Sequence, residues 1–184
     1  MYIHDTYFIV AHIHYVLFGG SLFGVFAGIT YWYPKMFGRM MNETLGKIHF
    51  WITFIAFNCT FFPMHILGMA GHMRRIYNPM QYDFLKPVQG INVFISISAF
   101  VLGSAQFLFL ANIIWSGIKG KRASENPWNA NTLEWTTPSP PPHGNWPGTV
   151  PVVYRGPYEY SSPEVAEDFL PQSQLIEHTT AAAD

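Results

Sequence analysis

The chain has 184 residues, of which 49% are hydrophobic and 11% are charged, and its formal net charge is −1. Soluble domains carry about 25% charged residues, and here the hydrophobic residues gather in three long blocks, which is typical of a membrane protein. The near-neutral charge argues against a nucleic-acid partner. The single cysteine, Cys59, excludes an intrachain disulfide and a thiolate metal cluster built from this chain alone.

The first apolar block covers residues 7–33 and contains no Asp, Glu, Lys or Arg. It is long enough for a transmembrane helix, which needs about 20 such residues. His12 and His14 lie near its start. Helical residues two positions apart project roughly 200° from each other, so the two imidazoles face opposite neighbours and do not chelate one metal. Such a pair suits two haems, one on each side, because histidine is a common axial ligand of haem iron.

The alternative is that both histidines are core residues, hydrogen-bonded to neighbouring helices. Ionisable residues inside a membrane more often mark function, which favours a ligand role for this pair. Upstream, His4 and Asp5 offer an imidazole and a carboxylate, a partial site for a hard divalent cation that needs further oxygen ligands. A stripe of glycines at a spacing of four residues suits helix packing as well as contact with a flat ligand; it consists of Gly20, Gly24 and Gly28.

Two further transmembrane helices are predicted over residues 48–69 and 88–118. With three spans, seven Lys and Arg residues fall on one side of the membrane and three on the other. The positive-inside rule then places the N-terminus outside and the C-terminal tail inside. Arg74 and Arg75 lie on the outer face, where arginine is less expected. Guanidinium groups pair with carboxylates, and haem propionates would supply carboxylates on the same side as the two histidines of the first block.

From residue 123 onward the composition becomes proline-rich and acidic, and long apolar runs are absent from the sequence. Residues 138–142 include four prolines, which favours an extended polyproline segment. We expect residues 123–184 to form an extended tail on the inner face, ordered only where it lies on partner surfaces and disordered at its end. The predicted organisation is therefore a transmembrane haem-binding region, residues 1–122, followed by this tail.

Several motifs, in order along the chain, closely resemble subunit I of haem-copper cytochrome c oxidase. The run from His4 to Leu17, His-Asp-Thr-Tyr-Phe-Ile-Val-Ala-His-Ile-His-Tyr-Val-Leu, resembles the motif of its tenth helix. The other resemblances are residues 47–50 and 61–69 to the eleventh helix, residues 71–75 to the haem-propionate loop, and residues 131–135 with 140–142 to the C-terminal motif. Because these motifs follow one another at matching spacings over most of the chain, the resemblance is specific.

The resemblance implies an all-α membrane fold, in which the three predicted helices complete the twelve-helix bundle of a subunit I. Only the last three helices would be present in this sequence. The N-terminal part of subunit I would then come from a separate polypeptide or from the rest of a longer one, and an initiating Met1 favours a split gene.

The resemblance also implies roles for the residues singled out above. His12 would be the axial ligand of the high-spin haem a3 at the oxygen-reducing centre, and hence the catalytic histidine. His14 would be an axial ligand of the low-spin haem a. Arg74 and Arg75 would bind the haem propionates.

His4 and Asp5 become, by the same resemblance, a Mg²⁺ or Mn²⁺ site shared with another subunit. The copper ion CuB is expected in the complex, but its ligands belong to earlier helices. The sequence departs from the family pattern at two places. Ile13 stands where many relatives have phenylalanine, so electron transfer between the haems does not require an aromatic side chain at this position. His72, in Gly-His-Met, stands in a loop where Gly-Met-Pro is commoner, although both arginines of the loop are kept.

These roles imply part of the catalytic subunit of a terminal respiratory oxidase, which oxidises cytochrome c, reduces O₂ to water and translocates protons. It would act only with the missing helices and with oxidase subunits II and III, in contact with membrane lipid. The alternatives are a quinol oxidase of the same superfamily, a nitric-oxide reductase, a two-haem electron carrier without copper, and a non-catalytic membrane assembly subunit. The proline-rich acidic tail looks more like bacterial forms, which favours a bacterial plasma membrane over the mitochondrial inner membrane.

Overall fold

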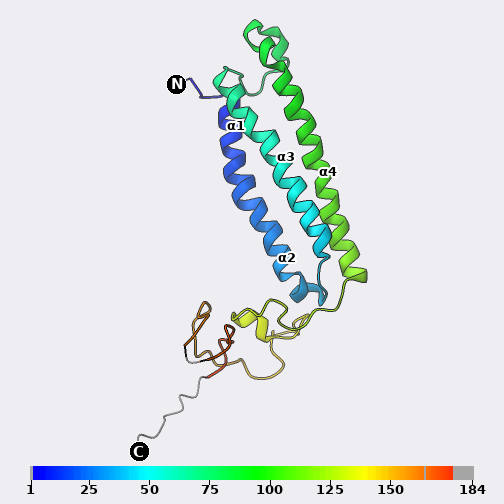
Figure 1. The fold of residues 1–184 in the computed structure, drawn as a ribbon, viewed down its shortest axis with the longest axis vertical. Coiled ribbons are helices and arrows are strands. Elements are labelled where there is room, and N and C mark those ends of the chain that lie inside the picture. The colour runs from blue at the N-terminus through cyan, green and yellow to red at the C-terminus, as the bar shows by residue number, and fades with distance from the viewer. Residues whose placement is uncertain (1, 164, 176–184) are drawn as a thin grey trace, which may run out of the picture. The chain divides into compact units, whose positions relative to one another are not determined.

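The computed structural model describes residues 2–163 and 165–175, and within them the regular elements are helices (Figure 1). Three continuous helical stretches are long and apolar enough to cross a membrane: Tyr7–Phe37, Glu43–Met69 and Asp83–Lys119. In Figure 1, α3 (Glu43–Met69) runs antiparallel to α1 (Tyr7–His14) and to α4 (Gln89–Lys119). The expected all-α membrane architecture is therefore confirmed.

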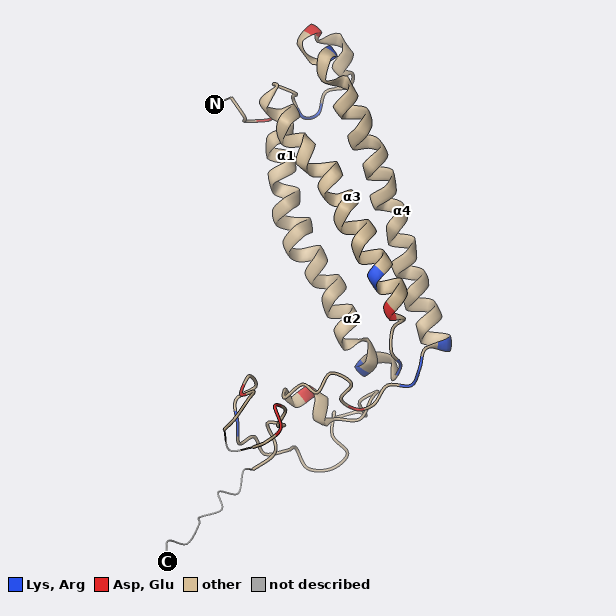
Figure 2. Ribbon diagram, in the orientation of Figure 1, with Lys and Arg blue, Asp and Glu red and all other residues tan. Residues whose placement is uncertain are grey.

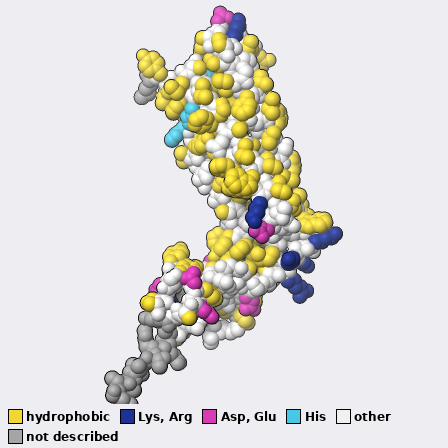
Figure 3. Space-filling view, in the orientation of Figure 1, with side chains coloured by type: hydrophobic (Ala, Val, Ile, Leu, Met, Phe, Trp, Pro, Cys, Tyr) yellow, Lys and Arg dark blue, Asp and Glu magenta, His cyan; other side chains and the backbone are white. Residues whose placement is uncertain are grey.

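Charged residues mark the ends of these helices. The middle stretch of each one carries no Asp, Glu, Lys or Arg, and the charges lie beyond it, as Figure 2 shows. The surface between the charged ends is covered with large apolar side chains (Figure 3). Such a surface must face lipid or further helices, because water would not solvate it.

The first long helix has three parts: α1, a π-helical stretch η1 (Tyr15–Leu22) and α2 (Phe23–Phe37). Thr6 caps the start of α1, and its side chain accepts a hydrogen bond from the Phe8 amide at 3.3 Å. The π-helical stretch begins directly after His14. Wide turns of this kind are rare and are frequently found at functional sites, and the apolar pattern alone did not predict one here.

The helix ends differ from the predicted spans. α2 continues through Pro34 to Phe37 rather than ending at residue 33, because the Pro34 carbonyl still accepts from the Gly38 amide at 2.8 Å. α3 begins at Glu43 rather than at residue 48, because the Asn42 side chain caps it by accepting from the Leu45 amide at 3.0 Å. Both helices thus extend past their apolar spans, and α4 differs from its predicted span by one residue at each end.

The chain divides into two compact units. The first comprises residues up to 30 together with residues 41–118, and so contains α1, η1, about half of α2, α3 and nearly all of α4. Its core is aromatic and aliphatic, built from Ala56, Phe57, Phe61 and Leu102 with Tyr15, Phe18, Phe23 and Met64 packed around them.

Within the first unit, α1 and α3 cross at Gly68. A Cβ atom placed on Gly68 would lie 2.6 Å from both the Cα and the Cβ of Phe8, so only glycine permits this approach. The crossing brings the start of α1 against the end of α3. It therefore fixes which chain segments meet at this end of the bundle.

Polar side chains join α3 to α4 at several levels. The Asn112 side chain donates to the Asn42 carbonyl at 3.0 Å, and Ser116 accepts from the Asn42 amide at 3.0 Å. Deeper in the helices, His49 lies 3.2 Å from the Gln106 side chain, which also contacts Thr53. These contacts satisfy polar groups that would otherwise be costly inside a membrane.

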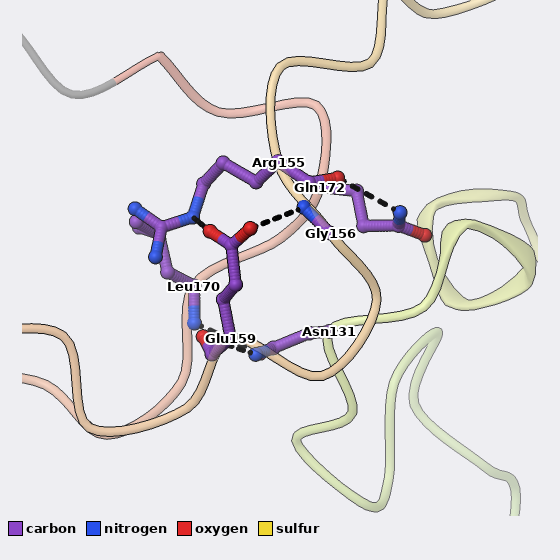
Figure 4. Close-up of polar contacts among 6 residues, drawn as sticks. All are labelled: Asn131, Arg155, Gly156, Glu159, Leu170 and Gln172. Atoms are coloured by element: carbon purple, nitrogen blue, oxygen red, sulfur yellow. Dashed lines mark hydrogen bonds and ion pairs between the residues drawn. The ribbon is translucent and has the colours of Figure 1, made fainter.

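The second unit combines residues 31–40 with the described part of residues 119–184. Asn131 is its main hydrogen-bonding centre: its side chain donates to the Glu159 carbonyl at 3.0 Å and accepts from the Leu170 amide at 2.9 Å (Figure 4). The Arg155 guanidinium lies 3.4 Å from the Glu159 carboxylate in the same cluster. The division at residue 122 and the extended tail stay predictions, and the predicted disorder at the tail's end falls on residues outside the described part of the chain.

Candidate functional site

His14 is held in a defined orientation on α1. Its ring stacks on Phe61 of α3, with 4.4 Å between centroids and 14° between planes. Its Nδ1 lies 2.7 Å from the Val10 carbonyl oxygen, and since a carbonyl can only accept, this nitrogen must donate. In the neutral imidazole the proton is then on Nδ1, and Nε2 keeps the lone pair that binds a metal. A histidine ligand is oriented in this way by its second nitrogen.

His12 has a different environment. It is exposed on the surface of α1, and within the described residues its ring has no hydrogen bond and no aromatic contact. The neighbouring Ile13 is also exposed. One histidine thus packs against α3 while the other faces away from the three helices. The angular separation of the two positions accounts for this difference.

The segment before α1 pairs with the loop after α3. Thr6 and Met73 form an isolated antiparallel bridge. On either side of it, the Tyr7 amide donates to the His72 carbonyl at 2.9 Å and the Arg74 amide donates to the Asp5 carbonyl at 2.9 Å. The predicted cation-site residues and the predicted propionate-site residues therefore meet at one end of the bundle.

The loop reaches this position because α3 ends in a tight reversal. Gly71 has φ +86°, a conformation that L side chains rarely adopt. Its amide donates to the Gly68 carbonyl at 3.1 Å, and the next amide, that of His72, donates to the Leu67 carbonyl at 2.9 Å. The reversal folds the chain back toward α1, so that Arg74 lies beside Asp5.

Asp5 contacts two of the other predicted site residues. One carboxylate oxygen forms an ion pair with the Arg74 guanidinium, and the other lies 3.2 Å from His4 Nε2. Asp5 itself has φ +57°, in the left-handed region that Asp tolerates better than most residues. The side chains of His4 and Asp5 are 68% and 55% exposed, so both can still reach a ligand from solution or from another subunit.

Two nitrogens at this end of the bundle are buried without a partner. Arg74 Nε and His72 Nε2 have no hydrogen bond among the described residues. Leaving a buried polar group unpaired costs about 1–3 kcal/mol. Arg74 donates, and a carboxylate is the natural acceptor for a guanidinium. The site is therefore chemically suited to a propionate that the folded chain does not itself provide.

His72 was noted in the sequence only as a departure from the family pattern. In the structure it is 2% exposed, its ring stacks on Tyr7 with 4.1 Å between centroids, and its Nδ1 lies 3.0 Å from the Met73 carbonyl oxygen. Arg75, by contrast, is exposed and has φ +66°. The burial of His72 follows from its contact with Tyr7, which the sequence does not show.

No group of three or more His, Cys, Asp or Glu side chains that could hold a metal ion occurs in the part of the chain that the structure describes. His4 and Asp5 supply two donor groups. Mg²⁺ is typically bound by one or two carboxylates with several waters. These two residues fit such an ion only with ligands from water or from another polypeptide.

The fold and this cluster define a class: an integral membrane protein whose α1 carries one histidine oriented by the backbone and a second that faces away from the other helices. Residues 1–101 match the family model described as cytochrome C and quinol oxidase polypeptide I, and the chain belongs to that family.

The names of similar curated proteins agree with this family assignment. The chain is 47% identical over 172 residues to an alternative cytochrome c oxidase subunit 1 of Bradyrhizobium diazoefficiens, which covers 92% of this chain and 29% of the relative. It is 52% identical over 162 residues to a cytochrome c oxidase subunit 1 of Thermostichus vulcanus, and 50% identical over 160 residues to that of a Synechocystis species. In both cases 87% of this chain and 28% of the relative are covered.

The chain thus spans less than a third of the length of these relatives and corresponds to part of a subunit I. The resemblance to subunit I is confirmed, and so is the integral membrane character. Haem, copper and other oxidase subunits are implied by family membership in general. The individual ligands, the cation site, the electron donor and the membrane orientation stay predictions.

Proposed function

We propose that the chain forms one side of both haem pockets in the catalytic subunit of a terminal respiratory oxidase, which oxidises cytochrome c, reduces O₂ to water and translocates protons. The observation that carries the proposal is the orientation of His14, whose Nδ1 donates to Val10 and whose Nε2 remains available. The subunit would be active only when the N-terminal part of subunit I and oxidase subunits II and III complete it.

The two histidines have separate roles in this proposal. His14 is an axial ligand of the low-spin haem a, and Phe61 fixes the plane of its ring. His12 is the axial ligand of the high-spin haem a3, on the opposite side of the helix, where it faces the missing helices. The bound haems supply the redox-active iron; the chain holds them at fixed positions two residues apart.

Arg74 and Arg75 bind the haem propionates. Arg74 is positioned by its ion pair with Asp5, and its unpartnered Nε is free to donate to a carboxylate. Arg75 is exposed and can reach a second carboxylate. Neutralising propionates with two guanidinium groups lowers the cost of holding these charges at the membrane surface.

His4 and Asp5 bind Mg²⁺ or Mn²⁺ together with ligands from a partner subunit. Their exposure supports a shared site, and their contact with each other supports the binding of one ion by both donor groups. CuB, in this proposal, is ligated by the helices that precede this segment. The N-terminus lies on the outer side of the membrane and the tail on the inner side, in agreement with the distribution of Lys and Arg.

The electron donor is cytochrome c. The similar relatives are named cytochrome c oxidase subunit 1, which supports this donor over quinol. The family model covers quinol oxidases too, so a quinol oxidase is the second candidate. Oxidation of reduced cytochrome c by the purified complex, set against oxidation of a quinol, distinguishes the two.

The experiment that tests the haem assignment is a reduced-minus-oxidised optical spectrum of the purified complex, recorded with and without carbon monoxide. His12→Ala should remove the haem that binds carbon monoxide, and His14→Ala should remove the low-spin signal. His65→Ala, on α3, is the matched control and should keep both signals. Full haem occupancy in both of the first two variants would show that the histidines are structural and the proposal is wrong.

A further inference from the structure

The second unit contains a cavity of about 490 Å³ beside the end of α2. Its wall includes Phe37, Arg39, Arg122, Glu125 and Pro140. A volume in this range accommodates a small ligand or a lipid head group. None of these residues belongs to the haem and cation cluster described above.

Backbone pairing holds the two arginines side by side. Arg39 and Arg122 form an isolated antiparallel bridge. The Met40 amide donates to the Lys121 carbonyl at 2.8 Å, and the Ala123 amide donates to the Gly38 carbonyl at 3.0 Å. Residues directly opposite each other in an antiparallel pair project to the same face, with Cβ atoms about 5 Å apart. Two guanidinium groups are thus directed to one cavity.

The two guanidinium groups keep most of their donors free. Arg39 Nη1 donates to the Gly120 carbonyl at 2.7 Å, which anchors this side chain. The Arg122 side chain is exposed and has no hydrogen bond or ion pair within the described residues. An anion in the cavity could therefore accept from both side chains without displacing an ion pair.

The cavity lies at the level where an apolar span ends. Phe37 is the last residue of the span Tyr7–Phe37, it lines the cavity, and it is 51% exposed. Trp32, five residues before Phe37, and Met36, the residue directly before it, are also exposed. Basic pockets at the membrane ends of helices are suited to anionic lipid head groups, and aromatic residues favour the same level.

We propose that this cavity binds the phosphate of an anionic membrane phospholipid, with Arg39 and Arg122 donating to the phosphate oxygens and Phe37 contacting the start of the acyl chains. The lining residues carry two guanidinium charges and the Glu125 carboxylate. Their sum is one positive charge, which complements a lipid with one negative charge, such as phosphatidylglycerol, better than a zwitterionic lipid. The Glu125 carboxylate can accept from head-group hydroxyls.

The test is the lipid content of the purified complex that contains this chain, exchanged into a detergent solution of phosphatidylglycerol and phosphatidylethanolamine and analysed by mass spectrometry. Removing one interfacial arginine charge should lower retention of phosphatidylglycerol about fivefold, and Arg122→Gln makes this change without removing an internal contact. Lys121→Gln is the matched control: it removes the same charge at the adjacent residue, which does not line the cavity, and retention should not change.

Two further measurements identify the ligand. Glu125→Gln should raise retention of phosphatidylglycerol, because it removes the like charge from the cavity. After delipidation, phosphatidylglycerol should raise the thermal transition of the wild-type complex and inorganic phosphate at the same concentration should not, if the ligand is a lipid rather than a free anion. Equal retention in Arg122→Gln and wild type, equal loss in Lys121→Gln, or selective retention of phosphatidylethanolamine would each overturn the proposal.

Discussion

One buried and one half-buried cation, in the two units, differ in how their donors are used. In the second unit, Lys35 is 7% exposed, and its ammonium donates to the Glu125 and Thr137 carbonyls at 3.0 and 2.6 Å and lies 5.1 Å from the centre of the Trp135 ring. In the first unit, Arg74 has one ion pair with Asp5 and a buried Nε without a partner. The fold supplies two hydrogen bonds and a ring contact to the Lys35 ammonium, whereas it leaves the Nε donor of Arg74 unpaired.

This difference separates structural from binding roles. Removing a buried charge that donates to backbone carbonyls leaves those carbonyls unpaired and lowers stability. A buried donor that the chain leaves unpaired is available to a ligand, a water molecule or another polypeptide. Substitution of Lys35 should therefore lower mainly the stability of the protein, and substitution of Arg74 should weaken mainly the binding of a ligand.

The largest expected effect comes from the residue that positions the Arg74 region. Gly68→Ala would place a Cβ against the backbone of Phe8, so one helix must shift and the cost should exceed the usual overpacking range of about 1–3 kcal/mol. Because the crossing also fixes the Asp5–Arg74 pair, haem content of the purified complex should fall together with its thermal transition. Gly90→Ala, which meets no described atom within 4 Å, is the control. Normal stability of Gly68→Ala would mean that α1 and α3 do not cross there.

Lys35→Met should lower the stability of the second unit by about 2–3 kcal/mol, because two carbonyls lose charge-assisted hydrogen bonds. The haem spectrum of the fraction of the complex that stays folded should be unchanged. Limited proteolysis of the region after residue 119, compared between Lys35→Met and the exposed-site variant Lys121→Met, measures the effect. Loss of haem with an unchanged cleavage rate would reverse the roles assigned to the two cations.

Arg74→Gln should affect haem binding more than it affects the stability of the chain. The Asp5–Arg74 pair is partly exposed, so its loss alone should cost about 1 kcal/mol or less, and the main effect of Arg74→Gln should be weaker haem binding and a shifted haem midpoint potential. The Asp5 carboxylate also loses its partner, so the Mn²⁺ signal in electron paramagnetic resonance should broaden or weaken. Lys86→Gln, which breaks only an exposed pair with Asp83, should change neither signal. An unaltered potential in Arg74→Gln would exclude a contact between Arg74 and a haem propionate.

The smallest effect concerns a hydrogen bond at the start of the π-helical stretch. The Tyr15 hydroxyl donates to the Asn58 side chain at 2.8 Å, and Tyr15→Phe should lower the stability of the complex by about 1 kcal/mol. Tyr77→Phe, at a residue that is 97% exposed, should have no measurable effect. Equal thermal transitions for the two variants would show that the Tyr15–Asn58 contact contributes nothing to stability.

The sequence predicted the three membrane helices because their charge-free runs are long and distinct. It did not predict their ends, since Asn42 caps α3 before the apolar residues begin and Pro34 is accommodated in the last turn of α2. It placed Asp5 and Arg74 on one side of the membrane. It could not pair them, because the residues are 69 positions apart and the pairing depends on the reversal at Gly71.

Resemblance, rather than periodicity, supplied the individual ligand roles. The geometry that bears on them, the Nδ1 bond of His14 and the orphaned Nε of Arg74, appears only when α1, α3 and the following loop are folded together. The buried state of His72 was unforeseen for the same reason. Its stacking partner, Tyr7, lies in α1, 65 positions before it in the chain.

The π-helical stretch Tyr15–Leu22 also changes the phase of the first helix. Because its turns are wider than those of an α-helix, residues after it are rotated relative to where a 3.6-residue period would place them. The spacing of four residues therefore corresponds to a different rotation between Gly20 and Gly24 than between Gly24 and Gly28, which both lie on α2. An alanine scan along residues 7–37 should show two periodic patterns of sensitivity, one on each side of this stretch, displaced in angle from each other.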